Sequence, residues 1–328
     1  MESYLGTGAP ELKIENAILA IESSINALND RVSYLEKTMD KISKNNRLRI
    51  QSVPIGEVFE KDRYNVCNLW EGVPPNDYQQ KLEETYTRNW IDLFHTRYST
   101  ITIRDPDLKW LQEAFKVGTI TGTFPKTFVE ELEGTSEKIT GACLRNCFIR
   151  GEASSLKGNA VYGPGPFNNS REILEALCTC RCTHHPFSKE VEEKRELKLY
   201  VLPWLDNLKI GLEFRAFVYG KKLTALSPQY IYGANSAIRD DIEIGGAYKI
   251  MTVVKFLEKK VIPALKNHDT YTVDVALLED ESGDCEPYFI EINGFGAEYS
   301  AGSALFHWVR DKEILEGGGD KVAVRYVK

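Results

Sequence analysis

Two apolar segments near the C-terminus, residues 271–279 and 288–296, constrain the fold of this 328-residue chain more than any other feature. Each alternates or clusters apolar residues as a half-buried β-strand does, and a polar, turn-forming segment separates them. We expect an antiparallel hairpin, in which Asp274 on the first strand lies beside Glu291 on the second. Asn293 would point to the same face as Glu291, because residues two apart in a strand share a face.

This arrangement predicts a metal site on the hairpin. Asp274, Glu291 and Asn293 would bring two carboxylates and one amide oxygen together. These are the hard oxygen ligands that Mg²⁺ prefers when phosphates and water complete its octahedron. The alternative is a solvated sheet face that carries unrelated acidic residues, and the hairpin alone does not decide between the two.

Composition argues against several classes of protein. A net charge of −7 without a Lys/Arg-rich run argues against a dedicated nucleic-acid surface or an anionic-membrane surface. No apolar run reaches transmembrane length, and the N-terminus lacks the basic and apolar regions of a signal peptide. The seven cysteines are scattered and mostly lie within apolar stretches, which fits a reducing compartment. We therefore expect a cytoplasmic protein that contacts neither membranes nor nucleic acid.

The N-terminal segment shows a heptad repeat over four heptads, in which apolar residues recur at alternating spacings of four and three. The stripe is narrower than the apolar face of a helix that packs on its own domain. We therefore expect residues 1–48 to form a coiled coil that self-associates through residues 14–42, as a dimer or a trimer, with packing in cis as the alternative. The stripe consists of Ile14, Ile18, Ile21, Ile25, Leu28, Val32, Leu35, Met39 and Ile42.

The rest of the chain predicts an α+β domain. Residues 49–89 have the proline and asparagine content of a connector, and short strand-like and helix-like segments alternate from residue 90 onward. The strand-like segments fit antiparallel hairpins better than a βαβ ladder. We expect an N-lobe over about residues 90–195 and a C-lobe over about residues 196–328.

Several motifs, in their order and spacing, resemble those of the cell-division-cycle-protein-123 family. The similarity covers about residues 90–315, and its clearest parts are Gly211-Leu-Glu-Phe-Arg-Ala-Phe-Val218, Asp274, Glu291-Ile-Asn293 and the tail that ends in Leu305-Phe-His-Trp308. That family is a divergent branch of the ATP-grasp fold. The resemblance therefore implies a two-lobed ATP-grasp fold with antiparallel sheets that binds ATP and Mg²⁺ between its lobes.

The resemblance also implies which residues hold the nucleotide. Arg150 and Lys157 would contact the α- and β-phosphates, Arg150 through a two-pronged guanidinium and Lys157 as a point charge. The alternative is that both are ordinary surface side chains. A hinge strand would offer its backbone to the adenine edge, although an apolar strand of this kind also fits a plain core strand. The hinge residues are Lys198, Leu199, Tyr200, Val201 and Leu202.

Arg215 lies in an otherwise apolar strand-like segment. A buried arginine needs an anion nearby. The resemblance implies that a triphosphate supplies that anion and that Arg215 is the catalytic residue. A structural ion pair with Glu213 or Asp274 is the alternative.

One departure from the family pattern bears on activity. The family's Asp-aromatic-Asn-Pro is replaced here by Glu291-Ile-Asn293-Gly294, and Glu-x-Asn is found in many catalytically active ATP-grasp ligases. The resemblance therefore implies an ATP-dependent ligase that acts through an acyl-phosphate on an unknown carboxylate acceptor, either a protein or a small molecule. The alternative is a non-catalytic nucleotide-binding assembly factor, the role that eukaryotic members have for translation initiation factor 2.

Overall fold

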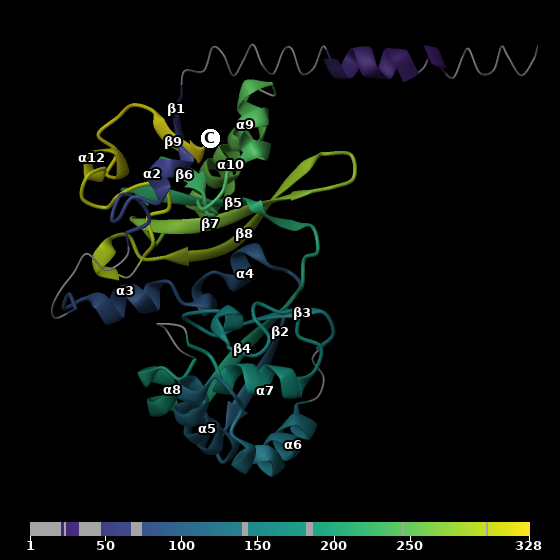
Figure 1. Ribbon diagram of the computed structural model, residues 1–328, viewed down its shortest axis with the longest axis vertical. Helices are drawn as coiled ribbons and strands as arrows, with labels where there is room; N and C mark the ends of the chain where they lie inside the picture. The colour runs from purple at the N-terminus through teal and green to yellow at the C-terminus, as the bar shows by residue number, and fades with distance from the viewer. Residues whose placement is uncertain are drawn as a thin grey trace, which may run out of the picture.

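The computed structural model describes residues 21–22, 24–32, 47–66, 74–139, 144–181, 186–244, 246–299 and 301–328. Figure 1 shows a small lobe built on a three-stranded sheet and a large lobe built on a six-stranded sheet. Helices and strands are mixed in both lobes, which confirms the α+β class predicted from the sequence.

The small lobe has an antiparallel sheet in the order β2-β4-β3. Its helix α7 begins after Asn169, whose side chain accepts a hydrogen bond from the backbone N–H of Glu172 and so caps the helix. The apolar face of α7, which includes Ile173 and Leu177, is buried in the core of this lobe. The elements are β2 (Ser99–Arg104), α5 (Asp107–Thr121), α6 (Val129–Lys138), β3 (Cys147–Arg150), α7 (Ser170–Cys178), α8 (Lys189–Lys194) and β4 (Glu196–Pro203).

The large lobe has a sheet in the order β1-β9-β6-β5-β7-β8. β9 runs parallel to both β1 and β6, so this sheet is mixed. The sequence had predicted antiparallel sheets. β1 and β9 come from distant parts of the chain, and strands that are not joined by a tight turn are free to pair in parallel. The strands are β1 (Leu48–Val53), β5 (Leu208–Tyr219), β6 (Lys222–Pro228), β7 (Tyr271–Glu279), β8 (Cys285–Asn293) and β9 (Val322–Val327).

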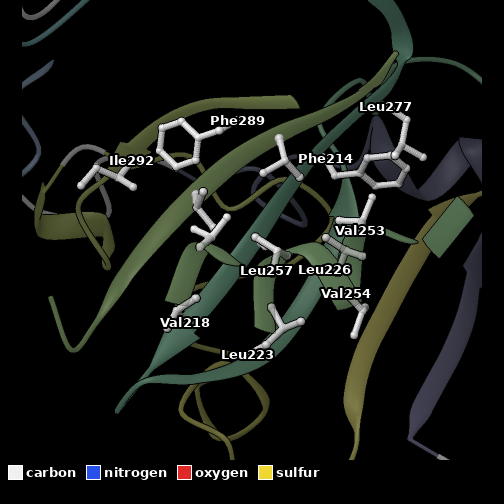
Figure 2. Packing of buried hydrophobic residues seen from close by; sticks show 14 of the residues in the cluster. Phe214, Val218, Leu223, Leu226, Val253, Val254, Leu257, Leu277, Phe289 and Ile292 are labelled. Atoms are coloured by element: carbon white, nitrogen blue, oxygen red, sulfur yellow. The ribbon is translucent and has the colours of Figure 1, made fainter. Parts of the chain in front are cut away.

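One face of the large sheet carries the main hydrophobic core (Figure 2). Phe214 and Val218 of β5 lie there, together with Leu277 of β7, and Val253 of helix α10 packs in the same cluster. Because side chains alternate across a strand, the intervening polar residues of β5 and β7 point to the opposite face. The helices of this lobe are α2 (Ile55–Val58), α9 (Ser236–Glu243), α10 (Tyr248–Phe256), α11 (Ile262–Ala264) and α12 (Lys312–Leu315). Two further helices, α3 (Tyr78–Glu84) and α4 (Ile91–Phe94), lie between the lobes in Figure 1.

The C-terminal tail covers part of that opposite face. Phe217 of β5 lies 6.4, 5.3 and 5.5 Å, between ring centroids, from Phe295, Phe306 and Trp308 respectively. The Trp308 indole N–H donates a hydrogen bond to the carbonyl of Ala301 at 2.8 Å. The aromatic motif near residue 308 is therefore a packing element of the large lobe.

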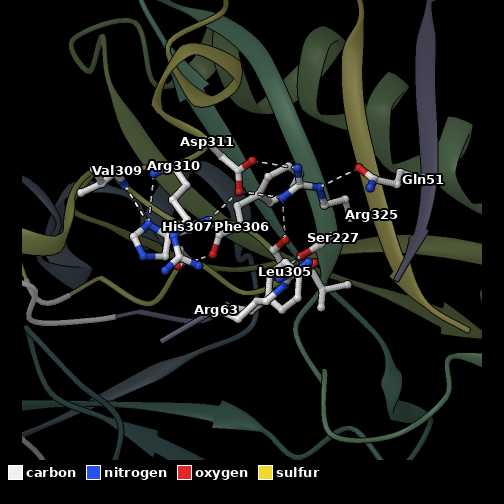
Figure 3. A network of polar contacts seen from close by, with 12 residues as sticks. Gln51, Arg63, Ser227, Leu305, Phe306, His307, Val309, Arg310, Asp311 and Arg325 are labelled. Atoms are coloured by element: carbon white, nitrogen blue, oxygen red, sulfur yellow. Dashed lines mark hydrogen bonds and ion pairs between the residues drawn. The ribbon is translucent and has the colours of Figure 1, made fainter. Parts of the chain in front are cut away.

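A polar network fastens the same tail to β9 (Figure 3). Arg325 donates two hydrogen bonds to Asp311, from Nη1 to Oδ2 at 2.6 Å and from Nη2 to Oδ1 at 2.7 Å. Its guanidinium also lies 4.6 Å from the centroid of the Phe306 ring. Asp311 further accepts a hydrogen bond from the backbone N–H of His307, so the tail is held by charge as well as by packing.

Two lobe boundaries lie elsewhere than the sequence suggests. Residues 49–89, expected as a connector, include most of β1, which pairs with β9 and so belongs to the large sheet. β4 pairs with β2 and β3, so the small lobe extends to Pro203 and does not end at residue 195. Both differences have one cause: the sheet that a strand joins depends on partners far away in the chain.

The N-terminal helix is described at residues 21, 22 and 24–32. In this stretch Ile25 and Leu28 are 50% and 62% exposed, and Ile21 and Val32 are also exposed. The other stripe positions (Ile14, Ile18, Leu35, Met39 and Ile42) lie outside the described residues. Self-association through the stripe therefore stays a prediction.

Across the described residues, no helix combines the length and apolar character needed to cross a bilayer.

Replacing Ile25 and Val32 by Asp is expected to convert an oligomeric protein into a monomer, because association would then bury unpaired charges in the seam. Light scattering measures the mass. The control adds the same charge beside the stripe, through Asn26→Asp and Ala27→Asp, and should leave the mass unchanged. A monomeric unaltered protein would contradict the coiled-coil prediction.

Candidate functional site

A pocket of about 490 Å³ lies between the two lobes. This volume is typical of small-molecule sites. Its small-lobe wall comes from β3 and from the chain that leaves β4, and its large-lobe wall comes from β5 and β8. Much of the lining is apolar and includes Phe148, Leu202, Trp204 and Ile210. Arg150, Lys157 and Glu213 add ionisable groups to the same lining.

Arg150 joins the two lobes at this pocket. Its Nη2 donates to Glu291 Oε2 at 2.8 Å, its Nη1 to the carbonyl of Ile290 at 3.5 Å, and its Nε to Thr87 Oγ1 at 3.1 Å. The guanidinium lies 4.7 Å from the centroid of the Trp90 ring. The side chains of Arg150 and Glu291 are 4% and 14% exposed, so they form a largely buried ion pair.

Arg215 and Asp274 form a second buried ion pair on neighbouring strands. Arg215 donates from Nε to Asp274 Oδ1 at 2.8 Å and from Nη2 to Oδ2 at 2.7 Å. Its Nη1 donates to the carbonyl of Gly302 at 2.9 Å. Of the two anions that the sequence left open for a structural pair, Asp274 is therefore the partner of Arg215.

The three residues expected to bind metal are brought together. Asp274 and Glu291 lie opposite each other in the antiparallel pairing of β7 and β8, which confirms the predicted hairpin. Asn293 Nδ2 lies 3.4 Å from Asp274 Oδ2. This oxygen-rich donor set fits Mg²⁺. Among the described residues no group of three or more His, Cys, Asp or Glu side chains is placed to hold a metal ion, so these donors would need further oxygens from a ligand or water.

The charged groups at this site shift one another's pKa values. Burial is the main cause that raises the pKa of Glu213 to about 7; the Asp274 carboxylate adds to the rise and Lys157 opposes it. Burial acts to raise the pKa of Glu291 as well. The positive charges of Arg150 and Lys157 outweigh that effect and hold the pKa of Glu291 below its usual range.

The Glu213 shift predicts a pH dependence of stability. The raised pKa means that Glu213 keeps its proton up to about pH 7 in the folded protein, whereas a glutamate carboxyl ordinarily has a pKa of 4.5. Its contribution to stability is therefore complete below pH 4.5 and is lost as the pH rises through 7. As the pH rises from 4.5 to about 7, the free energy of unfolding of Glu213→Gln should increase relative to that of the wild type, as measured by urea unfolding. The exposed Glu286→Gln is the control, and parallel curves for Glu213→Gln and wild type would contradict the assignment.

The expected hinge residues lie mostly away from the pocket. Leu199 and Val201 are buried in the core of the small lobe. Tyr200 is buried in the cluster that also contains Phe214 of the large sheet. Lys198 lines a different, smaller pocket. Leu202 does line the pocket between the lobes, followed by Pro203, Trp204 and Leu205. The chain that borders this pocket is thus Leu202–Leu205, a few residues later than the sequence suggests.

Glu213 and His95 are among the pocket residues that the sequence did not indicate. Glu213 lies two positions before Arg215 on the same strand, and this spacing was the available signal. His95 follows helix α4 and has no comparable signal. Burial, helped by the charge of Arg150, lowers the pKa of His95 to about 4, so its imidazole is neutral at pH 7. Its Nε2 is buried and has no hydrogen-bond partner among the residues that the structure describes.

Residues 167–328 match the family model D123. These residues form a D123 domain. This confirms the resemblance found in the motifs. The D123 match contains Arg215, Asp274 and Glu291, whereas Arg150 and Lys157 precede it, so the matched region supplies the large-lobe wall of the pocket.

Solved structures show that the fold is shared more widely than the sequence. Cdc123 from Schizosaccharomyces pombe aligns with a TM-score of 0.52 at 16% identity, over 76% of this chain and 97% of that chain. Its C-terminally truncated form gives 0.51 at 15% identity, over the same shares of the two chains. A RimK domain ATP-grasp protein from Sphaerobacter thermophilus gives 0.24 at 13% identity over 65% of this chain and 66% of that chain, which is too low to indicate a common fold. No curated protein is significantly similar in sequence.

Proposed function

We propose that this D123-family protein binds ATP together with Mg²⁺ in the pocket between its lobes, and that it is an ATP-dependent ligase. One observation carries the proposal: the pocket joins an apolar lining to small-lobe cations that face large-lobe carboxylates. A nucleotide has the same two parts, an aromatic base and a polyanionic phosphate chain.

The parts of the pocket match the parts of the nucleotide. The apolar lining at Leu202–Leu205 and Ile210 suits a purine base. Arg150 and Lys157 suit the phosphates, because a guanidinium can bind two oxygens at once and an ammonium acts as a compact point charge. Along β5 the lining changes from Ile210 to Glu213, so the strand runs from the apolar part of the pocket toward its charged part.

Asp274, Glu291 and Asn293 are the residues that would hold Mg²⁺, which when bound neutralises charge on the phosphates. Arg215 is held rigidly by Asp274 and Gly302, so its positive charge is fixed close to these ligands. In the proposed reaction an acceptor carboxylate oxygen bonds to the terminal phosphorus of ATP as the bond to ADP breaks. A nucleophile then attacks the acyl carbon of this acyl-phosphate, and inorganic phosphate leaves.

The second candidate is a nucleotide-binding assembly factor without turnover. The bidentate pairing of Arg215 with Asp274 favours it, because an arginine already engaged by a carboxylate has fewer donors left for a transferring phosphoryl group. Release of ADP and phosphate with a mass change in an acceptor would select the ligase. Binding without turnover would select the assembly factor.

Calorimetric titration tests the shared premise of both candidates. Mg-ATP is expected to bind the wild type, and Lys157→Met is expected to weaken binding by about tenfold or more, because a charge-assisted contact to phosphate is lost. Lys157 is exposed, so this change should leave the fold intact. Lys198→Met removes an equal charge from the other pocket and should bind Mg-ATP like the wild type. A wild type that does not bind Mg-ATP would refute the proposal.

A further inference from the structure

We infer that the Arg150–Glu291 ion pair is a latch between the lobes, which ATP and Mg²⁺ open together by taking its two partners separately. The inference rests on the proposed nucleotide site. It adds that neither ATP nor Mg²⁺ binds well without the other, because the phosphate-binding cation and the metal-binding carboxylate neutralise each other.

The first step of the argument is the position of the pair. Arg150 ends β3 in the small sheet, and Glu291 lies on β8, the edge strand of the large sheet. The two residues are 141 positions apart in the chain and are joined at 2.8 Å. Arg150 also reaches the β8 backbone at the carbonyl of Ile290. The contact therefore links one lobe to the other across the pocket.

The second step concerns charge. Arg150 donates to Thr87 Oγ1 and the Ile290 carbonyl, which are neutral acceptors, and among the described residues Glu291 is the carboxylate paired with it. Removing one partner of a buried pair leaves the other charge uncompensated, which is strongly unfavourable. Each partner can therefore leave only when it receives a replacement of the same sign. A phosphate can replace Glu291 for Arg150, and a divalent cation can replace Arg150 for Glu291.

The third step identifies which pair opens. Arg215 and Asp274 share two hydrogen bonds on adjacent strands of one sheet, and Gly302 and Asn293 hold them further. No displacement of the lobes would separate that pair. Arg150 and Glu291 share one N–O contact and belong to different lobes. We assign the exchange to Arg150 and Glu291, with Arg215 and Asp274 staying paired.

Metal-free ATP provides the sharpest test, with binding measured by calorimetry in EDTA. Glu291→Gln should bind metal-free ATP about fivefold or more tightly than the wild type, because Arg150 is released to the phosphates. The same substitution should weaken Mg-ATP binding. Glu286→Gln, which removes an exposed charge from the same strand, should change neither affinity.

A double-variant cycle separates release of Arg150 from simple loss of repulsion. In an Arg150→Gln background, Glu291→Gln should alter metal-free ATP affinity by less than about twofold. A gain that persists in this background, or no gain in the single variant, would overturn the latch. If Glu291→Gln does not fold, Glu291→Asp keeps the charge but withdraws it from Arg150, and the same direction of change is required. If the wild type binds Mg-ATP but these variants do not bind metal-free ATP more tightly, the latch is refuted and the proposed function is not. A wild type that binds no nucleotide refutes both.

Discussion

Arg215→Met is expected to lower the free energy of unfolding by about 3–5 kcal/mol, because it leaves the buried Asp274 carboxylate without its counter-charge. Asp274 is 4% exposed and receives two hydrogen bonds from Arg215. If phosphate were the sole anion of Arg215, the empty protein would instead keep its normal stability after this change. Urea unfolding without nucleotide distinguishes the two outcomes.

Two further variants make the Arg215 experiment specific. Arg239→Met removes an arginine from the solvent-exposed pair with Asp240 and should change stability by less than about 1 kcal/mol. Arg215→Met combined with Asp274→Leu removes both buried charges and should recover most of the loss, since a buried pair can often be replaced by apolar residues. A single Arg215→Met variant as stable as the wild type would show that Asp274 does not depend on Arg215.

Phe217→Ala is expected to destabilise the protein by about 3–5 kcal/mol, because the ring is fully buried and a packed core relaxes only partially into the cavity left behind. Its neighbours Phe306 and Trp308 belong to the tail, which would lose its main apolar contact on β5. Urea unfolding gives the change in free energy, and a red shift of tryptophan fluorescence in the native baseline would report exposure of Trp308.

The matched control for Phe217 is Phe59→Ala. Phe59 is 66% exposed, so the same truncation there should cost less than about 0.5 kcal/mol. Equal losses for the two variants would contradict the view that the tail motif is a packing element.

The family resemblance and the hairpin were predicted correctly because both depend on local patterns. The alternation of apolar residues in residues 271–279 defines a strand and assigns each side chain to a face, and the short polar segment that follows permits one antiparallel partner. The hairpin follows from these two facts, but the register does not: a shift of one residue between Asp274 and Val275 brings Asp274 opposite Glu291. The prediction that these two candidate metal ligands lie side by side is confirmed, and their role stays a prediction.

The hinge and the charges around it could not be predicted in the same way. Residues 198–202 have the apolar character of any core strand, so the sequence does not show which part of the chain borders the pocket. The structure shows that this part is Leu202–Leu205. The raised pKa of Glu213 likewise depends on burial and on Asp274, which lies on another strand. Neither the burial of Glu213 nor its distance from Asp274 can be read from the residues next to Glu213 in the chain.

Local residue patterns were enough to predict the α+β class, the β7–β8 hairpin and the motifs shared with the family, because each depends on residues close together in the chain. The packed lobes were needed to show that β1 joins the large sheet, that β4 belongs to the small one, and that Arg150 contacts Glu291, 141 positions away. The two kinds of information differ in range. Backbone periodicity acts over a few residues, whereas a buried charge selects whichever opposite charge the packed lobes bring within about 3 Å.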